Sequence, residues 1–169
     1  MKSVSLRIVL VSLLFLLAVP GTVAGLVPYW LSGWEADTSL LDSGWIAVLG
    51  IGVLLAGLCG LLQSVVHFAR DGQGTPAPAA PPKCLVVSGF YRHVRNPMYL
   101  SVLLAIAGQG LILGNARVLA YAGGLWLTFH LALVFHEEPC LALRFGDAYR
   151  IYCRQVGRWW PRLWNKHAR

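Results

Sequence analysis

The sequence predicts an all-α integral membrane protein with about four transmembrane helices and a C-terminal amphipathic helix at the membrane interface. The chain has 169 residues, of which 57% are hydrophobic and only 12% are charged. A soluble core of this size cannot bury so much apolar surface, and the basic residues flank long apolar stretches. The net charge of +7 is therefore interpreted as an orientation signal and not as a nucleic-acid-binding surface.

Four apolar stretches are the expected transmembrane helices. They are residues 8–27, 45–68, 99–113 and 118–135. Because the hydrocarbon core needs about 20 helical residues, the third stretch is short unless its Asn-Pro entrance is partly submerged. Asn115 and Arg117 predict a tight turn that joins the third and fourth helices into an antiparallel hairpin.

Small residues are expected inside and between these helices. Glycine spacings such as Gly52 to Gly60 and Gly108 to Gly114 are expected to permit close helix packing. The cysteines lie in different segments without CxxC spacing, which argues against a zinc site or a disulfide framework and favours small buried residues. They are Cys59, Cys84, Cys140 and Cys153. No metal site is predicted.

The charges of the loops predict the orientation in the membrane. Residues 28–44 hold acidic side chains and no basic one, whereas the N-terminus, residues 69–98 and the tail after His136 hold basic side chains. Both termini and the central loop are therefore expected in the cytoplasm, with the chain in a prokaryotic inner membrane. Residues 1–25 also resemble a secretory signal with a cleavage site at Thr22-Val23-Ala24. Cleavage would leave three spans and keep the acidic loop outside.

The C-terminal segment predicts one interfacial amphipathic helix over residues 139–156. Its apolar face is expected to hold Leu141, Phe145, Ala148, Tyr152 and Val156. Its other face is expected to hold Arg144, Asp147, Arg150, Arg154 and Arg158. Trp159, Trp160 and Trp164 are expected at the depth of the lipid headgroups. The alternative is that this helix only anchors the tail to acidic lipid.

Residues 89–100, "GFYRHVRNPMYL", contain a dense polar cluster before the third helix. Asn96 is a good N-cap and Pro97 suits the first helical turn. The N-terminus of a helix can hold an anion such as a carboxylate or phosphate, and Arg92 and Arg95 add positive potential there. The alternative is a capped helix with an ordinary basic anchor.

Glu137 and Glu138 follow the fourth span, where acids meet the negative end of the helix dipole. One interpretation is that they start a next helix at Pro139. The other is that one of them binds a cationic or hydroxyl-rich ligand. His130 lies inside the fourth span, where a polar residue is a site candidate by default. The alternative for His130 is a hydrogen bond between helices.

Two motifs resemble a known family. "SGFYRHVRNPMY" and "EEPCLALRFGDAYRIYCRQVGRWWP", with a helical hairpin between them, resemble the isoprenylcysteine carboxyl methyltransferase family and related phospholipid methyltransferases. The resemblance covers about residues 83–162, whereas the first two spans match only in hydrophobicity. It divides the chain into an N-terminal two-helix membrane region, 1–68, and a methyltransferase-like region, 69–169. Signatures of soluble nucleotide-binding and metal-dependent enzymes, GxGxxG after a strand, GxxxxGK[ST] and HExxH, are missing.

The resemblance implies an S-adenosyl-L-methionine-dependent methyltransferase that acts on a lipid or lipid-modified acceptor. Carried over by position, the cofactor contacts are Lys83, Cys84, Leu85, Val86, Tyr91, Asn96, Pro97, Met98, Tyr99 and Glu137. Two positions depart from the family pattern: Asn96 replaces the usual His before Pro, and Leu133 replaces an Arg that contacts the prenylcysteine substrate in the eukaryotic enzyme.

The expected chemistry depends on the acceptor. A carboxylate is already ionised at neutral pH, whereas a phospholipid amine must lose a proton, which His130 or Glu138 could accept. Arg95 or Arg150 could hold an anionic group by forked hydrogen bonds. Two other functions stay open: a sterol-reductase-like enzyme that uses NADPH, and a non-enzymatic membrane protein whose basic tail binds acidic lipids or a partner.

Overall fold

The computed structural model describes residues 6–36, 44–72 and 84–162. These residues form helices and no strand, which confirms the predicted all-α class. Helical segments 10–32, 44–70 and 116–145 are long and apolar enough to cross a membrane, and α4 (Pro97–Leu113) is a shorter apolar helix of 17 residues. The chain is therefore an integral membrane protein, and its described residues include three long apolar helices and a short one.

The first helical segment is held to the rest of the bundle at a local irregularity. It comprises α1 (Leu6–Gly21), a π-helical turn (Thr22–Leu26) and α2 (Val27–Ser32), and is longer than predicted. A π-turn leaves backbone carbonyl groups without their usual helical partner. Gln109 Nε2 donates to Ala24 O at 2.7 Å, and Tyr121 Oη donates to Val23 O at 3.0 Å. Side chains from two later helices thus fix the first one.

Helices α3 (Gly44–Arg70) and α4 run antiparallel with their backbones in contact. A Cβ on Gly57 would lie 2.6 Å from Ala105 N, and one on Gly108 would lie 2.5 Å from Leu54 N. Only glycine allows this approach, as predicted for close helix packing. The prediction is wrong for Gly52, which has no neighbour within 4 Å of an added Cβ, and for Gly114, whose φ of 61° ends α4.

The turn after α4 confirms the predicted hairpin. Asn115 Oδ1 accepts hydrogen bonds from Arg117 N at 3.0 Å and Val118 N at 3.3 Å, which caps α5 (Ala116–Ala132). Val102 and Ile106 of α4 pack with the fully buried Val118 of α5. The hairpin therefore has its own core next to the first helical segment.

The fourth helix continues beyond the predicted span. α5 passes through a second π-turn (Leu133–Glu137) into α6 (Glu138–Phe145). At 1.5 Å per residue its 30 residues extend about 45 Å, more than the hydrocarbon thickness of about 30 Å, so one end must emerge into the interface. α6 carries the charged side chains of Glu138 and Arg144, which do not suit the hydrocarbon core, so α6 is the end that emerges.

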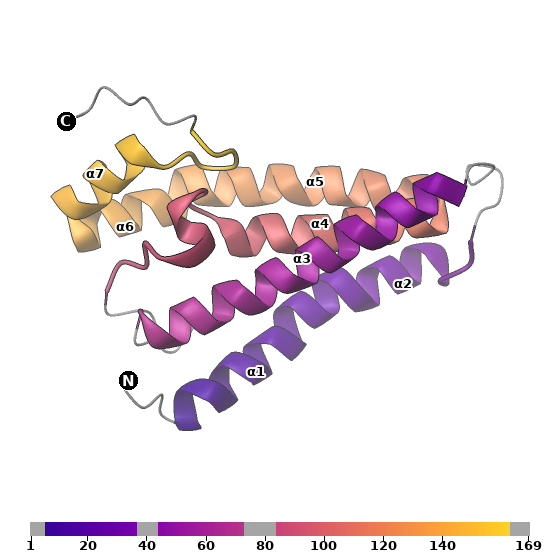
Figure 1. Ribbon diagram of the computed structural model, residues 1–169, viewed down its shortest axis with the longest axis horizontal. Coiled ribbons are helices and arrows are strands. Elements are labelled where there is room, and N and C mark those ends of the chain that lie inside the picture. The colour runs from indigo at the N-terminus through magenta and orange to yellow at the C-terminus, as the bar shows by residue number, and fades with distance from the viewer. Residues whose placement is uncertain (1–5, 37–43, 73–83, 163–169) are drawn as a thin grey trace.

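The predicted single helix over residues 139–156 is wrong. Gly146, with a φ of 55°, separates α6 from α7 (Asp147–Gln155). The apolar side is nevertheless mostly as predicted: Leu141, Phe145, Tyr152 and Val156 pack together, whereas Ala148 is exposed and Tyr149 is buried in its place. Figure 1 shows α6 and α7 at the end of the bundle where α1 starts, α3 ends and α4 starts.

The prediction that the cysteines are buried is also wrong. Cys59, Cys84 and Cys140 are exposed and Cys153 is half-buried, and all four are free thiols. Cys59 lies on the apolar helix α3, where an exposed thiol has the same apolar character as its neighbours, so hydropathy did not distinguish an exposed cysteine from a buried one there.

Candidate functional site

A hydrogen bond joins the two halves of the predicted site. Tyr99, in the first turn of α4, donates from Oη to Glu137 Oε2 at 2.8 Å. The Tyr99 ring packs on Phe129 of α5, with 4.6 Å between ring centroids. Glu137 is the last residue of the second π-turn, and both side chains are half-buried. The helix entrance and the acidic pair therefore meet, as the resemblance implied.

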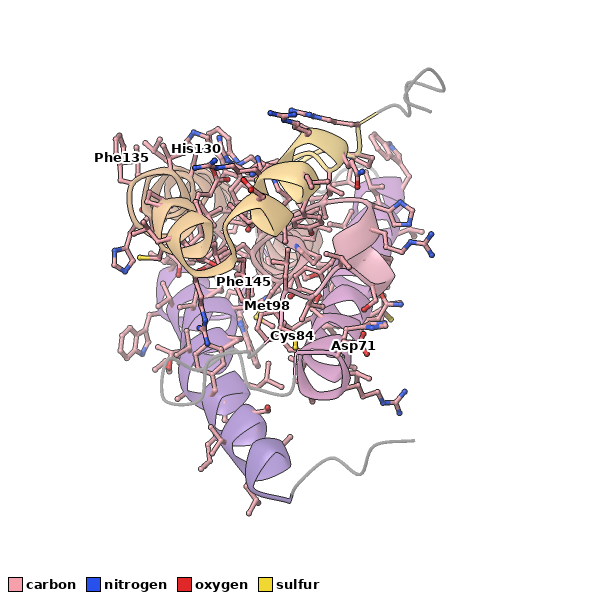
Figure 2. All side chains as sticks on the ribbon, turned by 90° about the vertical axis from the view of Figure 1, so that its left-hand side faces the viewer. Asp71, Cys84, Met98, His130, Phe135 and Phe145 are labelled. Carbon is pink, nitrogen blue, oxygen red and sulfur yellow. The ribbon has the colours of Figure 1, made fainter. Side chains whose placement is uncertain are left out.

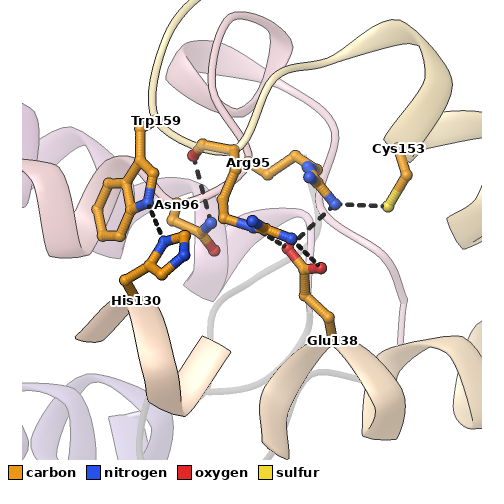
Figure 3. A network of polar contacts seen from close by, with 7 residues as sticks. Arg95, Asn96, His130, Glu138, Cys153 and Trp159 are labelled. Carbon is orange, nitrogen blue, oxygen red and sulfur yellow. Dashed lines mark hydrogen bonds and ion pairs between the residues drawn. The ribbon is translucent and has the colours of Figure 1, made fainter. Parts of the chain in front are cut away.

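Glu138 takes part in a different interaction from that of its neighbour. Arg158 forms a two-pronged contact with it, Nε to Oε1 at 2.7 Å and Nη2 to Oε2 at 2.8 Å. Arg95 Nη1 lies 3.2 Å from the same Oε1 (Figure 3). The hydrogen bond to Glu138 raises the pKa of the Arg158 guanidinium above its ordinary value. The prediction that Arg158 lies on the outer face of the amphipathic helix is therefore wrong.

Arg95 is held inside this cluster. Its side chain is only 10% exposed, and Nη1 also donates to Cys153 Sγ at 2.7 Å. Among the described residues, the buried Nε has no hydrogen-bond partner. Arg150, by contrast, has a 72% exposed side chain that pairs with Asp147 at 3.3 Å. Of the two arginines predicted to hold an anion, the structure leaves Arg150 accessible.

An open cleft of about 440 Å³ separates the end of the long helix from α7. Glu138, Arg150 and Cys153 line its polar part. Its other lining residues are Val134, Pro139, Ala142, Tyr149 and Arg154. Tyr99 and Glu137 do not line this cleft, so the predicted site residues divide between two faces of the helix.

The entrance of α4 differs from the prediction in one detail. Pro97 occupies the first helical turn as expected, but the Asn96 side chain makes no capping hydrogen bond. Instead, Asn96 Nδ2 donates to Arg158 O at 3.3 Å. Because the segment after α7 offers a carbonyl group at this point, the amide turns away from the helix start. The prediction that Asn96 caps the helix through its side chain is therefore wrong.

Trp159 contacts both His130, which is half-buried, and Leu133, which is buried. Trp159 Nε1 donates to His130 Nδ1 at 3.1 Å, and Leu133 is only 1% exposed against Leu103 and Trp159. A neutral imidazole has one ring nitrogen with a free lone pair, and Trp159 uses it here. Trp159 is 8% exposed and therefore lies inside the protein, whereas Trp160 is 79% exposed. Trp164 lies outside the described residues.

The segment before α4 packs under α7. Leu85 contacts the apolar cluster of α7, and Val86 is buried. Tyr152 Oη donates to Tyr91 O at 2.7 Å, and burial raises the pKa of both phenols, so they stay protonated at neutral pH. Figure 2 looks onto this end of the molecule, where Cys84 and Met98 appear near the centre. Lys83 lies outside the described residues.

A polar contact that the sequence did not reveal anchors this segment to α3. Ser88 Oγ contacts His67 Nδ1 at 3.0 Å and donates to Asp71 Oδ2, and His67 Nδ1 lies 2.9 Å from the same Asp71 oxygen. We call these three residues the α3 clasp. Hydrogen bonds from His67 and Ser88 hold the pKa of Asp71 below its ordinary range. The signal in the sequence was weak because the three residues are up to 21 positions apart.

Comparison with known proteins decides the family. Residues 45–148 match the family model described as phospholipid methyltransferase, which is more than half of the chain. The chain belongs to the phospholipid methyltransferase family. The match includes α3, the hairpin, both glutamates and the start of α7, and it confirms the resemblance that the two motifs indicated.

Three relatives are similar to part of the chain, and two of them have a stated activity. A protein-S-isoprenylcysteine O-methyltransferase from Schizosaccharomyces pombe is 34% identical over 43% of this chain and 30% of its own length. A Delta(14)-sterol reductase from Mus musculus is 34% identical over 47% of this chain and 19% of its own length. An uncharacterized protein from Haemophilus influenzae is 41% identical over 37% of this chain and 98% of its own length. The chain thus covers less than a third of each of the two relatives with a stated activity.

Proposed function

We propose that this chain is a membrane-embedded S-adenosylmethionine-dependent methyltransferase that acts on a lipid or lipid-modified acceptor. The observation that carries the proposal is the Tyr99–Glu137 hydrogen bond, which brings the start of α4 to the acidic pair across the hairpin. The family match and the methyltransferase from Schizosaccharomyces pombe support the reaction class. By the charge asymmetry of the loops, we propose that this end faces the cytoplasm.

The residues at this end fit the charges of such a cofactor. A carboxylate can accept about four hydrogen bonds, so Glu137 keeps acceptor positions beside the one used by Tyr99 and can hold an amino group or ribose hydroxyls. The first amide groups of α4 can hold a carboxylate. S-adenosylmethionine supplies a methyl group that is activated by its attachment to a sulfonium.

The other residues predicted to contact the cofactor fall into a buried group and a more accessible group. Val86, Tyr91 and Pro97 are buried, so we propose that they shape the pocket or contribute backbone groups. Leu85, Met98 and Asn96 are half-buried, and Cys84 is exposed, so their side chains are placed to meet a ligand. Lys83 is proposed on sequence position alone.

An apolar groove supports a lipid acceptor. It has a volume of about 420 Å³ and is formed by α1, α3 and α4 with the first π-turn. Val102 lines it on α4, about 7.5 Å along the helix from Pro97. A lipid chain in this groove would leave its polar end near the entrance of α4, where Tyr99 and Glu137 lie.

The geometry favours an acceptor that needs no general base. Trp159 occupies the free ring nitrogen of His130, and two guanidinium groups neutralise Glu138. A carboxylate meets this condition because it is ionised at neutral pH. Leu133 is buried where the resemblance expects an arginine, and Arg150 lines the cleft on the other face of the long helix. We therefore propose Arg150 as the cation only for an anionic acceptor that enters that cleft. Catalysis then depends on positioning and the exclusion of water.

The decisive experiment supplies the methyl donor together with candidate acceptors. Purified protein in lipid nanodiscs is incubated with S-adenosylmethionine labelled in its methyl group, and the labelled lipid fraction is identified. Nanodiscs that contain a prenylcysteine test the carboxylate acceptor, and nanodiscs that contain phosphatidylethanolamine test the amine acceptor. Transfer of label to either supports the proposal. No transfer, together with no binding of S-adenosylhomocysteine, would contradict it.

A second candidate follows from the similarity to the mouse Delta(14)-sterol reductase. In that case the same end of the bundle would bind NADPH. Titration of the same protein with NADPH and with S-adenosylhomocysteine separates the two enzyme classes. Binding of neither, together with binding to vesicles that contain acidic lipid, would favour the non-enzymatic alternative, in which the basic tail binds lipid.

A further inference from the structure

After α7 the chain returns to the entrance of α4. Gly157 pairs with Val94 in an isolated parallel bridge, and Arg95 N donates to Gly157 O at 2.8 Å. We call residues 157–159 the C-terminal strap. A Cβ at position 157 would overlap Trp160 O, so the strap requires glycine at its first position. It lies along the residues that lead into Pro97.

The side chains of the strap reach the long helix on both sides of the second π-turn. Arg158 makes its two-pronged contact with Glu138, directly after the turn. Trp159 donates to His130, before the turn (Figure 3). Trp159 also packs against Leu133, the first residue of the turn. The strap thus bridges α4 and the π-turn.

This arrangement bears directly on the Tyr99–Glu137 pair. Tyr99 follows Pro97 by two residues, and Glu137 lies in the π-turn between the two positions that the strap holds. A π-turn has poorer hydrogen bonding than an α-helix and is a common site of local adjustment. Without outside contacts, the direction of the Glu137 side chain would therefore be weakly fixed.

We propose that the C-terminal strap is a positioning element, with Arg158 and Trp159 as positioning residues that set the separation of Tyr99 and Glu137. The inference rests on the proposed function, because its consequence is cofactor affinity. Arg158 suits the role, since its planar guanidinium fixes the angle as well as the distance to a carboxylate. A strap that only closed the fold would stabilise the protein without a selective effect on cofactor binding.

The test compares three strap variants with a matched control. Arg158→Ala removes the two-pronged contact with Glu138, and Arg158→Lys keeps the positive charge without that contact. Trp159→Phe keeps an aromatic ring without the N–H donor. Arg144→Ala is the control, because Arg144 is an exposed arginine on α6 that lies over the Phe145 ring. Each protein is measured by hydrogen–deuterium exchange and by calorimetric titration with S-adenosylhomocysteine.

We expect Arg158→Ala to increase amide exchange at residues 94–100 and 133–139 and to weaken S-adenosylhomocysteine binding by about tenfold or more. Trp159→Phe should have a smaller effect, and Arg158→Lys should recover part of the affinity. Arg144→Ala should match the wild type. Faster exchange confined to residues 155–160, or unchanged affinity in Arg158→Ala, would overturn the proposal.

The two proposals fail in different ways. If the wild type binds no S-adenosylhomocysteine, the proposed function fails and the strap has no cofactor site to position. The exchange measurement still decides whether the strap couples α4 to the π-turn. If the wild type binds and Arg158→Ala binds equally well, only the positioning role is lost.

Discussion

Tyr99 Oη lies 2.8 Å from Glu137 Oε2, although 38 residues separate the two in the chain. This contact distinguishes two glutamates that are adjacent in sequence. Glu137 turns toward the helix entrance and keeps free acceptor positions, whereas Glu138 is held between Arg95 and Arg158. Of the two glutamates, Glu137 is therefore available to a ligand, whereas Glu138 stabilises the fold.

The ion cluster around Glu138 should dominate the stability of the polar end. Glu138→Gln leaves the guanidinium groups of Arg95 and Arg158 close together without their carboxylate, which we expect to cost about 3 kcal/mol. Asp147→Asn, which breaks only the exposed pair with Arg150, should cost less than about 1 kcal/mol. Thermal unfolding in detergent measures both. Equal melting temperatures for the two variants would contradict this account of the cluster.

The contact between α3 and α4 should not tolerate even one methyl group at its centre. In Gly57→Ala the new Cβ would meet backbone atoms of α4, so we expect a loss of about 2 kcal/mol. Gly52→Ala lies five positions away on the same helix in open space and should be neutral or stabilising by up to about 1 kcal/mol. The melting temperatures of both variants check the difference, and a stable Gly57→Ala would show that the helices pack less closely.

The α3 clasp should weaken in acid. Because the folded-state pKa of Asp71 is lowered, its contribution to stability is fully present above the ordinary value of about 3.9 and is lost as pH falls through the folded pKa. We expect the melting temperature of wild type to exceed that of Asp71→Asn above this range and the difference to shrink below it. A difference that grows toward acid pH would reverse the sign of the proposed linkage.

The orientation of the bundle can be read from thiol labelling. In a variant that keeps only Cys84, which is exposed at the end near α7, a membrane-impermeant maleimide should label broken cells but not intact cells. A cysteine-free background with Glu35→Cys, at the opposite end, should be labelled in intact cells. The reverse pattern would place the proposed site outside the cytoplasm.

Hydropathy located the helices because none of the four apolar stretches contains an Asp, Glu, Lys or Arg. The second span ends within two residues of its prediction, and Asn115 marks the hairpin turn through its cap. Periodicity did not locate the break at Gly146. The helical pattern continues on both sides of that residue, and only its positive φ separates α6 from α7.

The sequence predicted which residues form the site better than it predicted which partners they contact. The motifs indicated Tyr99 and Glu137 together, but charge alone placed Arg158 on an outer face. A long-range partner decided its position: the chain after α7 turns back, and Arg158 meets Glu138 at 20 positions' distance. The same fold-back places Trp159 beside His130 and turns Asn96 away from capping. Such contacts depend on tertiary structure, which local pattern does not contain.

The affinity of the protein for S-adenosylhomocysteine in four forms tests the central claim most directly. Calorimetry should show micromolar-range binding to wild type, weakened about tenfold or more in Tyr99→Phe and in Glu137→Gln, with the double variant little worse than Glu137→Gln. Tyr121→Phe is the control, since it loses a hydrogen bond at the opposite end of the bundle. Wild-type affinity in the folded Glu137→Gln variant, or no binding by wild type, would contradict the claim that these two side chains form the cofactor site.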